Sequence, residues 1–168
     1  WELPEENAEY EVYKEFAKQY FTPYLKNIKE CQTFTQCLGE KRYYIDGVEH
    51  QETERYAMIL NNSAVVSFWG RSRSKTAIYI DINGAKGPNT FGKDIFAFIL
   101  SNIPITSGNY HGRSDKPGLY FYGQGFSNSY LKTRYYACSK TEGTGNRGLY
   151  CGAWILQNNW KIPDDYPW

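Results

Sequence analysis

The sequence has few of the residues that bind metals or carry out acid–base catalysis. Its 168 residues include two separated histidines, His50 and His111, and four cysteines without CxxC spacing. Structural zinc sites usually show short Cys and His spacings, so no zinc site is expected. The motifs GxSxG, HExxH and GxxxxGK[ST] do not occur, and neighbouring acidic residues such as Asp164 and Asp165 point opposite ways on a strand. We therefore expect the chain not to be an enzyme and to require no cofactor.

A strong net charge and a long apolar run are also missing. Nineteen Lys and Arg residues stand against 18 Asp and Glu, giving a formal charge of +1. This balance argues against nucleic acid or an anionic membrane surface as an obligate partner. No apolar run reaches about 18 residues, so no segment of residues 1–168 is expected to span a bilayer. Because the sequence starts at Trp1 without an initiator Met, a membrane segment further upstream stays open.

Aromatic residues are abundant, with 16 Tyr, 9 Phe and 5 Trp making up 18% of the chain. Rigid core packing is the favoured explanation, and stacking on carbohydrate or on a protein partner is the alternative. Trp69, Tyr120 and Tyr122, with the basic residues at 71–75, are candidates for a sugar or phosphate surface. A solvated turn beside ordinary sheet aromatics is the favoured interpretation of these residues.

The cysteines form two close pairs, Cys31 with Cys37 and Cys138 with Cys151. Four cysteines allow three connectivities, of which we prefer the two sequential bridges over four free thiols. Each bridge would close a short loop and contribute roughly 2 to 3 kcal/mol. Disulfides indicate an oxidising compartment, the periplasm or the cell exterior in a bacterium.

Residues 5–30 carry the strongest periodic pattern and predict one amphipathic helix, about 39 Å long. Its apolar face contains Tyr10, Tyr13, Phe16, Ala17, Tyr20, Phe21, Tyr24, Leu25 and Ile28. Pro23 removes a backbone donor, so it is expected to kink the helix or to divide it in two.

The rest of the chain predicts strands. Residues 56–60 and 63–69 flank Asn61-Asn62 and indicate a hairpin, and residues 76–82 alternate Ile78, Ile80 and Ile82 on one side. Further expected elements are a short strand at 41–45, a strand or short helix at 94–100, an exposed strand at 119–123 and an apolar segment at 153–156. The pattern predicts one α+β domain over residues 1–168, its long helix packed on an antiparallel sheet. Residues 56–100 supply the core sheet, and 101–168 a variable, disulfide-closed C-terminal region.

Residues 81–96, DINGAKGPNTFGKDIF, combine turn residues with hard oxygen donors. The candidate calcium ligands are Asp81, Asn83, Asn89 and Asp94. The stretch is not an EF-hand, because Lys86 and Gly92 stand where that loop needs Gly and Glu. Asp, Asn, Gly and Pro also build ordinary turns, which is the favoured interpretation. A phosphate cradle is not indicated, because the glycines do not lead into a helix with the required spacing.

Three stretches together resemble a known family: YAMILNNSAVVSF, IYIDINGAKGPNTFGKDIFAFIL and the ending WKIPDDYPW, preceded by the amphipathic N-terminal pattern. The chain resembles the soluble part of bacterial type IV pilin-like proteins, which carry a prepilin-type cleavage and methylation signal. The resemblance covers about residues 5–168. It implies a structural subunit that assembles into a filament at the cell surface, with other pilin subunits and the inner-membrane assembly machinery as partners.

The same resemblance implies a cleaved leader and an apolar helix before Trp1, anchoring the subunit in the inner membrane before assembly. Cys138 and Cys151 would enclose the C-terminal region, which in such pilins is exposed and tends to serve adhesion. Related pseudopilins bind calcium in a loop after the sheet, although here the spacing differs. Two alternatives stay open: a pseudopilin of a type II secretion or DNA-uptake system, and a secreted carbohydrate-binding or adhesive domain.

Overall fold

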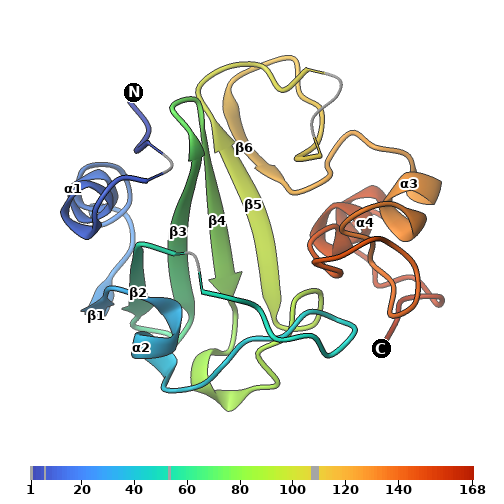
Figure 1. Cartoon of the computed structure of the whole chain (residues 1–168), viewed down its shortest axis with the longest axis horizontal. Helices are drawn as coiled ribbons and strands as arrows, with labels where there is room; N and C mark the ends of the chain where they lie inside the picture. Colours follow the sequence, from blue (N-terminus) through green and yellow to red (C-terminus); the bar gives the residue numbers. More distant parts are fainter. Residues whose placement is uncertain (1, 6, 53, 107–109) are drawn as a thin grey trace.

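A single antiparallel sheet organises the molecule, and each strand pairs with the next one along the chain (Figure 1). The computed structural model describes residues 2–5, 7–52, 54–106 and 110–168. The strands are β1 (Asn27–Cys31), β2 (Tyr56–Leu60), β3 (Val65–Ser72), β4 (Lys75–Asp81), β5 (Ile95–Ser101) and β6 (Gly118–Phe121). The α+β class predicted from the sequence is confirmed.

Short helices lie around this sheet. Within the described residues they are α1 (Tyr10–Tyr20), α2 (Phe34–Leu38), the 3-10 turn η1 (Gly84–Lys86), α3 (Asn128–Thr133) and α4 (Cys151–Gln157). Figure 1 shows α1 at one side of the sheet, with α3 and α4 at the other. Helices α2 and α3 were not predicted, because neither is long enough to show a helical period.

The long N-terminal helix predicted over residues 5–30 is not present. Helix α1 has 11 residues, and after a turn the chain continues into β1 instead of a second helix. Pro23 accounts for the stop, because proline disfavours helical backbone in the residue before it and cannot donate a backbone hydrogen bond. The last helical turn closes when the Phe21 N–H donates to the Ala17 carbonyl at 2.9 Å.

The predicted apolar face is correct only within α1. Tyr13, Phe16 and Ala17 are buried there against the sheet. Tyr24, beyond the helix, is 83% exposed. Ile28 belongs to β1, and its side chain lies outside the described residues. The spacing of apolar residues therefore keeps the helical period beyond Tyr20, although the backbone is no longer helical there.

The strand predictions agree more closely. Strand β2 has the predicted bounds. The apolar stretch at 94–100 forms most of strand β5, which pairs with β4 in a register that places Ile95 opposite Asp81 and Ser101 opposite Lys75. Residues 41–45 do not form a strand: Tyr43 makes only isolated bridges, to Glu49 and to Thr90. The apolar segment at 153–156 lies in α4.

The two faces of the sheet pack into separate cores. Alternation along β4 sends Ile78 and Ile80 toward α1, and Ala77 and Tyr79 to the opposite side. We call these sides the α1 face and the closed face. The closed face is covered by α2, by the segment around Tyr44 and by the C-terminal third of the chain, which together form the larger core.

Candidate functional site

The loop after β4 is held by two carboxylates that bind its backbone. The Asp81 Oδ1 atom accepts hydrogen bonds from the N–H groups of Asn83, at 3.0 Å, and Gly84, at 2.6 Å. Asp94 clamps the other end, its Oδ1 accepting from Thr90 N–H at 2.6 Å and its Oδ2 from Asn89 N–H at 2.9 Å. The structure thus brings the predicted Asp and Asn residues into one loop and gives both aspartates a backbone-holding role.

Three oxygen atoms of this loop are buried without a hydrogen-bond partner: Asp81 Oδ2, Asn83 Oδ1 and Asn89 Oδ1. The amide groups of the two asparagines donate elsewhere, Asn83 to the Gly87 carbonyl and Asn89 to the Glu40 carboxylate, each at 3.1 Å. Burial raises the pKa of Asp81 to about 6, against the two backbone hydrogen bonds that lower it, and the Asp94 charge raises it further. Buried acceptors without partners are costly, so these atoms are positions where a water molecule or a cation would bind.

Carboxylate and amide oxygens are the donors that calcium prefers. The set contains two carboxylates, and no group of three or more His, Cys, Asp or Glu side chains in the described part of the chain could hold a metal ion. Both oxygens of Asp94 already accept backbone hydrogen bonds. A cation here would therefore depend on Asp81, the asparagine carbonyls and backbone oxygens.

The carbonyl of Gly92 joins this loop to the end of the chain. It accepts hydrogen bonds from the Tyr166 hydroxyl and from Trp168 Nε1, the latter at 3.1 Å. Gly92 has a φ of +83°, and a Cβ there would lie 2.5 Å from Cys151 Sγ, so no other residue fits. Two of the three stretches that carry the resemblance to pilin-like proteins, far apart in sequence, therefore meet at Gly92.

Both sequential disulfides are present, Cys31–Cys37 and Cys138–Cys151. The first joins the end of β1 to α2, and the second joins the segment after α3 to the first turn of α4. They indicate an oxidising, extracytoplasmic environment. Among the described helices, none has the length and apolar character needed to cross a bilayer.

The α1 face is only half covered. Beyond α1, two adjoining depressions of about 380 and 450 Å³ share Ile80 and Ile82 and form what we call the apolar groove. Its floor contains Phe96, Phe98 and Phe121 of β5 and β6. Its α4 side contains Gly152, Ile155 and Trp160, and its α1 side contains Tyr20, Phe21, Tyr24 and Leu25. Ile82 is 57% exposed and Trp160 is 68% exposed. Among the residues that the structure describes, no charged side chain lines either depression.

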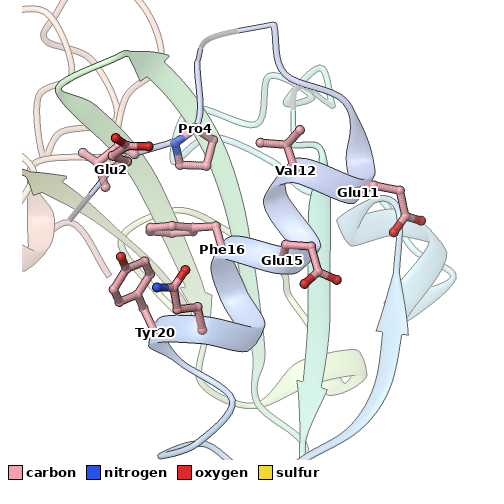
Figure 2. A pocket seen from close by; sticks show the side chains of 9 residues that line it. Glu2, Pro4, Glu11, Val12, Glu15, Phe16 and Tyr20 are labelled. Atoms are coloured by element: carbon pink, nitrogen blue, oxygen red, sulfur yellow. The ribbon is translucent and has the colours of Figure 1, made fainter.

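A larger hollow, of about 650 Å³, lies between residues 2–4 and α1 (Figure 2). Phe16 and Tyr20 point toward the N-terminal segment, whereas the carboxylates of Glu11 and Glu15 point away from it (Figure 2). Glu11 pairs with Lys14 at 3.4 Å. Because its acidic groups do not converge, this hollow has no arrangement that would bind a cation.

A model of a family described as a family of unknown function, DUF6613, matches residues 2–168. The chain belongs to the DUF6613 family. Neither a curated protein nor a solved structure matches it. The match spans the sheet, the loop at 81–94 and the C-terminal segment that binds it, so all three belong to the DUF6613 fold.

Sequence reasoning missed a buried ion pair of this DUF6613 chain. Arg42 and Glu54, 2% exposed each, form a two-pronged ion pair with both N–O distances at 2.5 Å. The Arg42 guanidinium also lies over the Phe34 ring at 4.2 Å and within 3.2 Å of His50 Nδ1. Both charges fall in an irregular stretch with no period, so nothing in the sequence marked them as buried. Of the aromatic candidates, Tyr122 is part of the closed-face core.

Proposed function

We propose that the chain is a non-catalytic structural subunit of a type IV pilus or a related filament. The observation that carries the proposal is the apolar groove on the α1 face. An exposed apolar surface with polar residues at its rim is a feature of many protein interfaces. The proposed occupant is a neighbouring subunit of the same filament. That neighbour would place a different surface of its own in the groove, because helical polymers form by contacts between two unlike surfaces.

The arrangement around the groove supports this proposal. Helix α1 lies on one face of an antiparallel sheet, and the disulfide-closed C-terminal region packs against the other face. A helix on an antiparallel sheet with such a C-terminal region is what the resemblance to pilin-like proteins implies. The groove lies between these two units, so a neighbour bound there would contact both. An inner-membrane anchor and assembly machinery as partners belong to the same proposal.

The test places a charge in the groove of the full-length protein in the cells that make it. Ile82→Glu is expected to keep the fold, because the Ile82 side chain is largely exposed. The amount of the protein in the filament fraction sheared from the cell surface is expected to fall by at least about tenfold. The matched control is Ile103→Glu, 45% exposed in a loop away from the groove, which leaves assembly unchanged. Absence of the wild-type chain from filaments by immunogold labelling, or normal assembly of Ile82→Glu, would overturn the proposal.

A second candidate function is that of a pseudopilin with a calcium-stabilised loop. The three unpartnered oxygens around Asp81 favour it. Calcium that binds only the folded state raises the melting temperature, by several degrees at about 100 times its dissociation constant. Asp81→Asn removes this response, whereas the exposed Asp164→Asn retains it. An identical melt of the wild-type protein in calcium and in chelator excludes the calcium site and leaves the filament proposal intact.

A further inference from the structure

We propose that a pocket on the closed face, between Trp69 and the segment around His50, binds a neutral saccharide. The pocket has a volume of about 350 Å³, within the range of small-molecule sites. Trp69 of β3 and Tyr79 of β4 form its sheet side, and Tyr44 and His50 enter from the segment that covers the sheet. It lies on the opposite face of the sheet from the apolar groove, so its ligand can be tested separately from the groove.

The wall of this pocket is a connected set of rings. His50 lies 5.2 Å from Tyr44 and 5.8 Å from Tyr79, measured between ring centroids. The guanidinium of Arg71 lies 4.1 Å from the Trp69 ring and holds that half-buried indole in place. A pyranose ring carries a flat patch of C–H groups on one side, and a fixed aromatic face is the surface that binds such a patch.

Arg42, which does not line the pocket, sets which nitrogen of the His50 ring carries the proton. Arg42 Nη2 lies 3.2 Å from His50 Nδ1, and because a guanidinium can only donate, Nδ1 must accept. The ring proton is therefore on Nε2. Burial, followed by the Arg42 charge, lowers the pKa of His50 to about 4, so the ring is neutral in neutral solution. Because His50 lines the pocket, its Nε2–H is the donor that the proposal assigns to the ligand.

Arg42 is itself fixed by Glu54 and Phe34. Glu54 forms a bidentate ion pair with the Arg42 guanidinium in the core, and the Phe34 ring stacks against the same guanidinium. Burying an ion pair seldom adds stability over an apolar pair of the same size, so its retention beside a pocket points to positioning. Arg42 and Glu54 are positioning residues in this proposal, and they act on the ligand through His50.

The remaining lining supplies neutral polar groups. Gln51 and Asn146 offer amide donors and acceptors at the exposed rim, and the Glu49 carboxylate is already paired with Lys41 at 2.8 Å. Neither Lys nor Arg occurs among the described residues that line the pocket. Burial raises the pKa of Tyr44 and Tyr79, so their hydroxyls stay protonated. Amides, hydroxyls and a neutral imidazole against an aromatic face suit the hydroxyls and C–H patch of an uncharged sugar.

The test uses methyl glycosides of glucose, galactose, mannose and N-acetylglucosamine as probes for the purified protein. Saturation-transfer NMR and titration are expected to show a millimolar dissociation constant for at least one of them. Trp69→Ala, and separately His50→Phe, weaken that binding by at least about tenfold. The matched control is Trp160→Ala, which removes an exposed indole of the apolar groove and leaves sugar binding unchanged.

Gln51→Ala provides a decisive variant if Trp69→Ala or His50→Phe does not fold, because Gln51 is exposed and its loss cannot disturb the core. It is expected to weaken binding by about threefold to tenfold. The proposal fails if no probe binds at about 20 mM. It also fails if a bound probe retains its affinity in every folded variant of the pocket.

Discussion

The two faces of the sheet differ in how far the chain covers them. On the closed face, helices α2, α3 and α4, both disulfides and the segment around Tyr44 enclose a continuous core. On the α1 face, an 11-residue helix covers part of the strands and leaves Ile80, Phe96 and Phe98 beside open space. The difference places most of the buried core on one side of the sheet and most of the exposed apolar surface on the other.

Matched phenylalanines give the largest expected contrast. Phe91→Ala on the closed face removes a ring that contacts Tyr44, His50 and Tyr79, and is expected to cost about 3 to 5 kcal/mol of unfolding free energy. Phe98→Ala on the α1 face is expected to cost about 1 to 2 kcal/mol, because the ring is only half buried. Urea denaturation midpoints measure both values, and equal losses would contradict the comparison.

The disulfides give the next contrast. Replacing Cys138 and Cys151 by alanine opens a 13-residue separation and is expected to cost about 3 kcal/mol, against about 2 kcal/mol for the 6-residue separation of Cys31 and Cys37. Thermal denaturation of the two double variants gives the order. A greater loss from the shorter loop would show that local packing, and not chain entropy, governs these bridges.

Acid sensitivity is expected to arise on the closed face. Burial lowers the pKa of His50 to about 4 and of His111 to about 3, against about 6.5 when unfolded, so the unfolded state binds more protons. Stability is therefore lost as the pH falls below about 6.5, by roughly 1 to 2 kcal/mol per histidine between pH 7 and 5. Asp81 acts in the opposite direction, because its pKa in the folded protein is raised to about 6. Its contribution to the unfolding free energy is lost as the pH rises through that value.

Replacing His111 by Gln is expected to flatten the decline, and Asp81→Asn to steepen it. Stability curves in urea at pH 5 and at pH 7 measure both changes. An identical pH dependence in the wild type and in His111→Gln would show that this histidine has the same pKa in both states.

The smallest effect on folding is expected in the apolar groove. Ile82→Ser changes the unfolding free energy by no more than about 0.5 kcal/mol, because the side chain is already 57% exposed. The same variant is expected to bind less of an apolar fluorescent dye at the groove. A large loss of stability from this substitution would mean that the α1 face is part of the core after all.

Local patterns predicted strands β2 to β6 but missed β1, because strand alternation and the Asn61-Asn62 turn depend on neighbouring residues. The helix at 5–30 failed because side-chain periodicity continues through Pro23, where the backbone cannot stay helical. The loop at 81–94 was predicted as a polar turn from its Asp, Asn and Gly residues, and its backbone hydrogen bonds agree with that prediction. Its orphaned oxygens were not predictable, because hydrogen-bond satisfaction depends on the whole surroundings.

The contacts made across long distances in sequence had no local signal. Nothing near Arg42 indicates that Glu54 would meet it in the core, and nothing near Trp69 indicates that His50 would face it. Arg42, His50 and Glu54 lie in the irregular segment between α2 and β2, where the sequence predicted only one short strand. The proposed saccharide pocket was invisible for the same reason.

The Gly92 carbonyl also bears on the order in which the molecule folds. Its partners, Tyr166 and Trp168, lie 74 and 76 positions further along the chain. Strands β2 to β5 use nearest-neighbour pairing, and the loop at 81–94 is held by local hydrogen bonds of Asp81 and Asp94. The contacts between this carbonyl and the C-terminal segment are therefore expected to form later than the sheet and the loop, and to dock the end of the chain onto both.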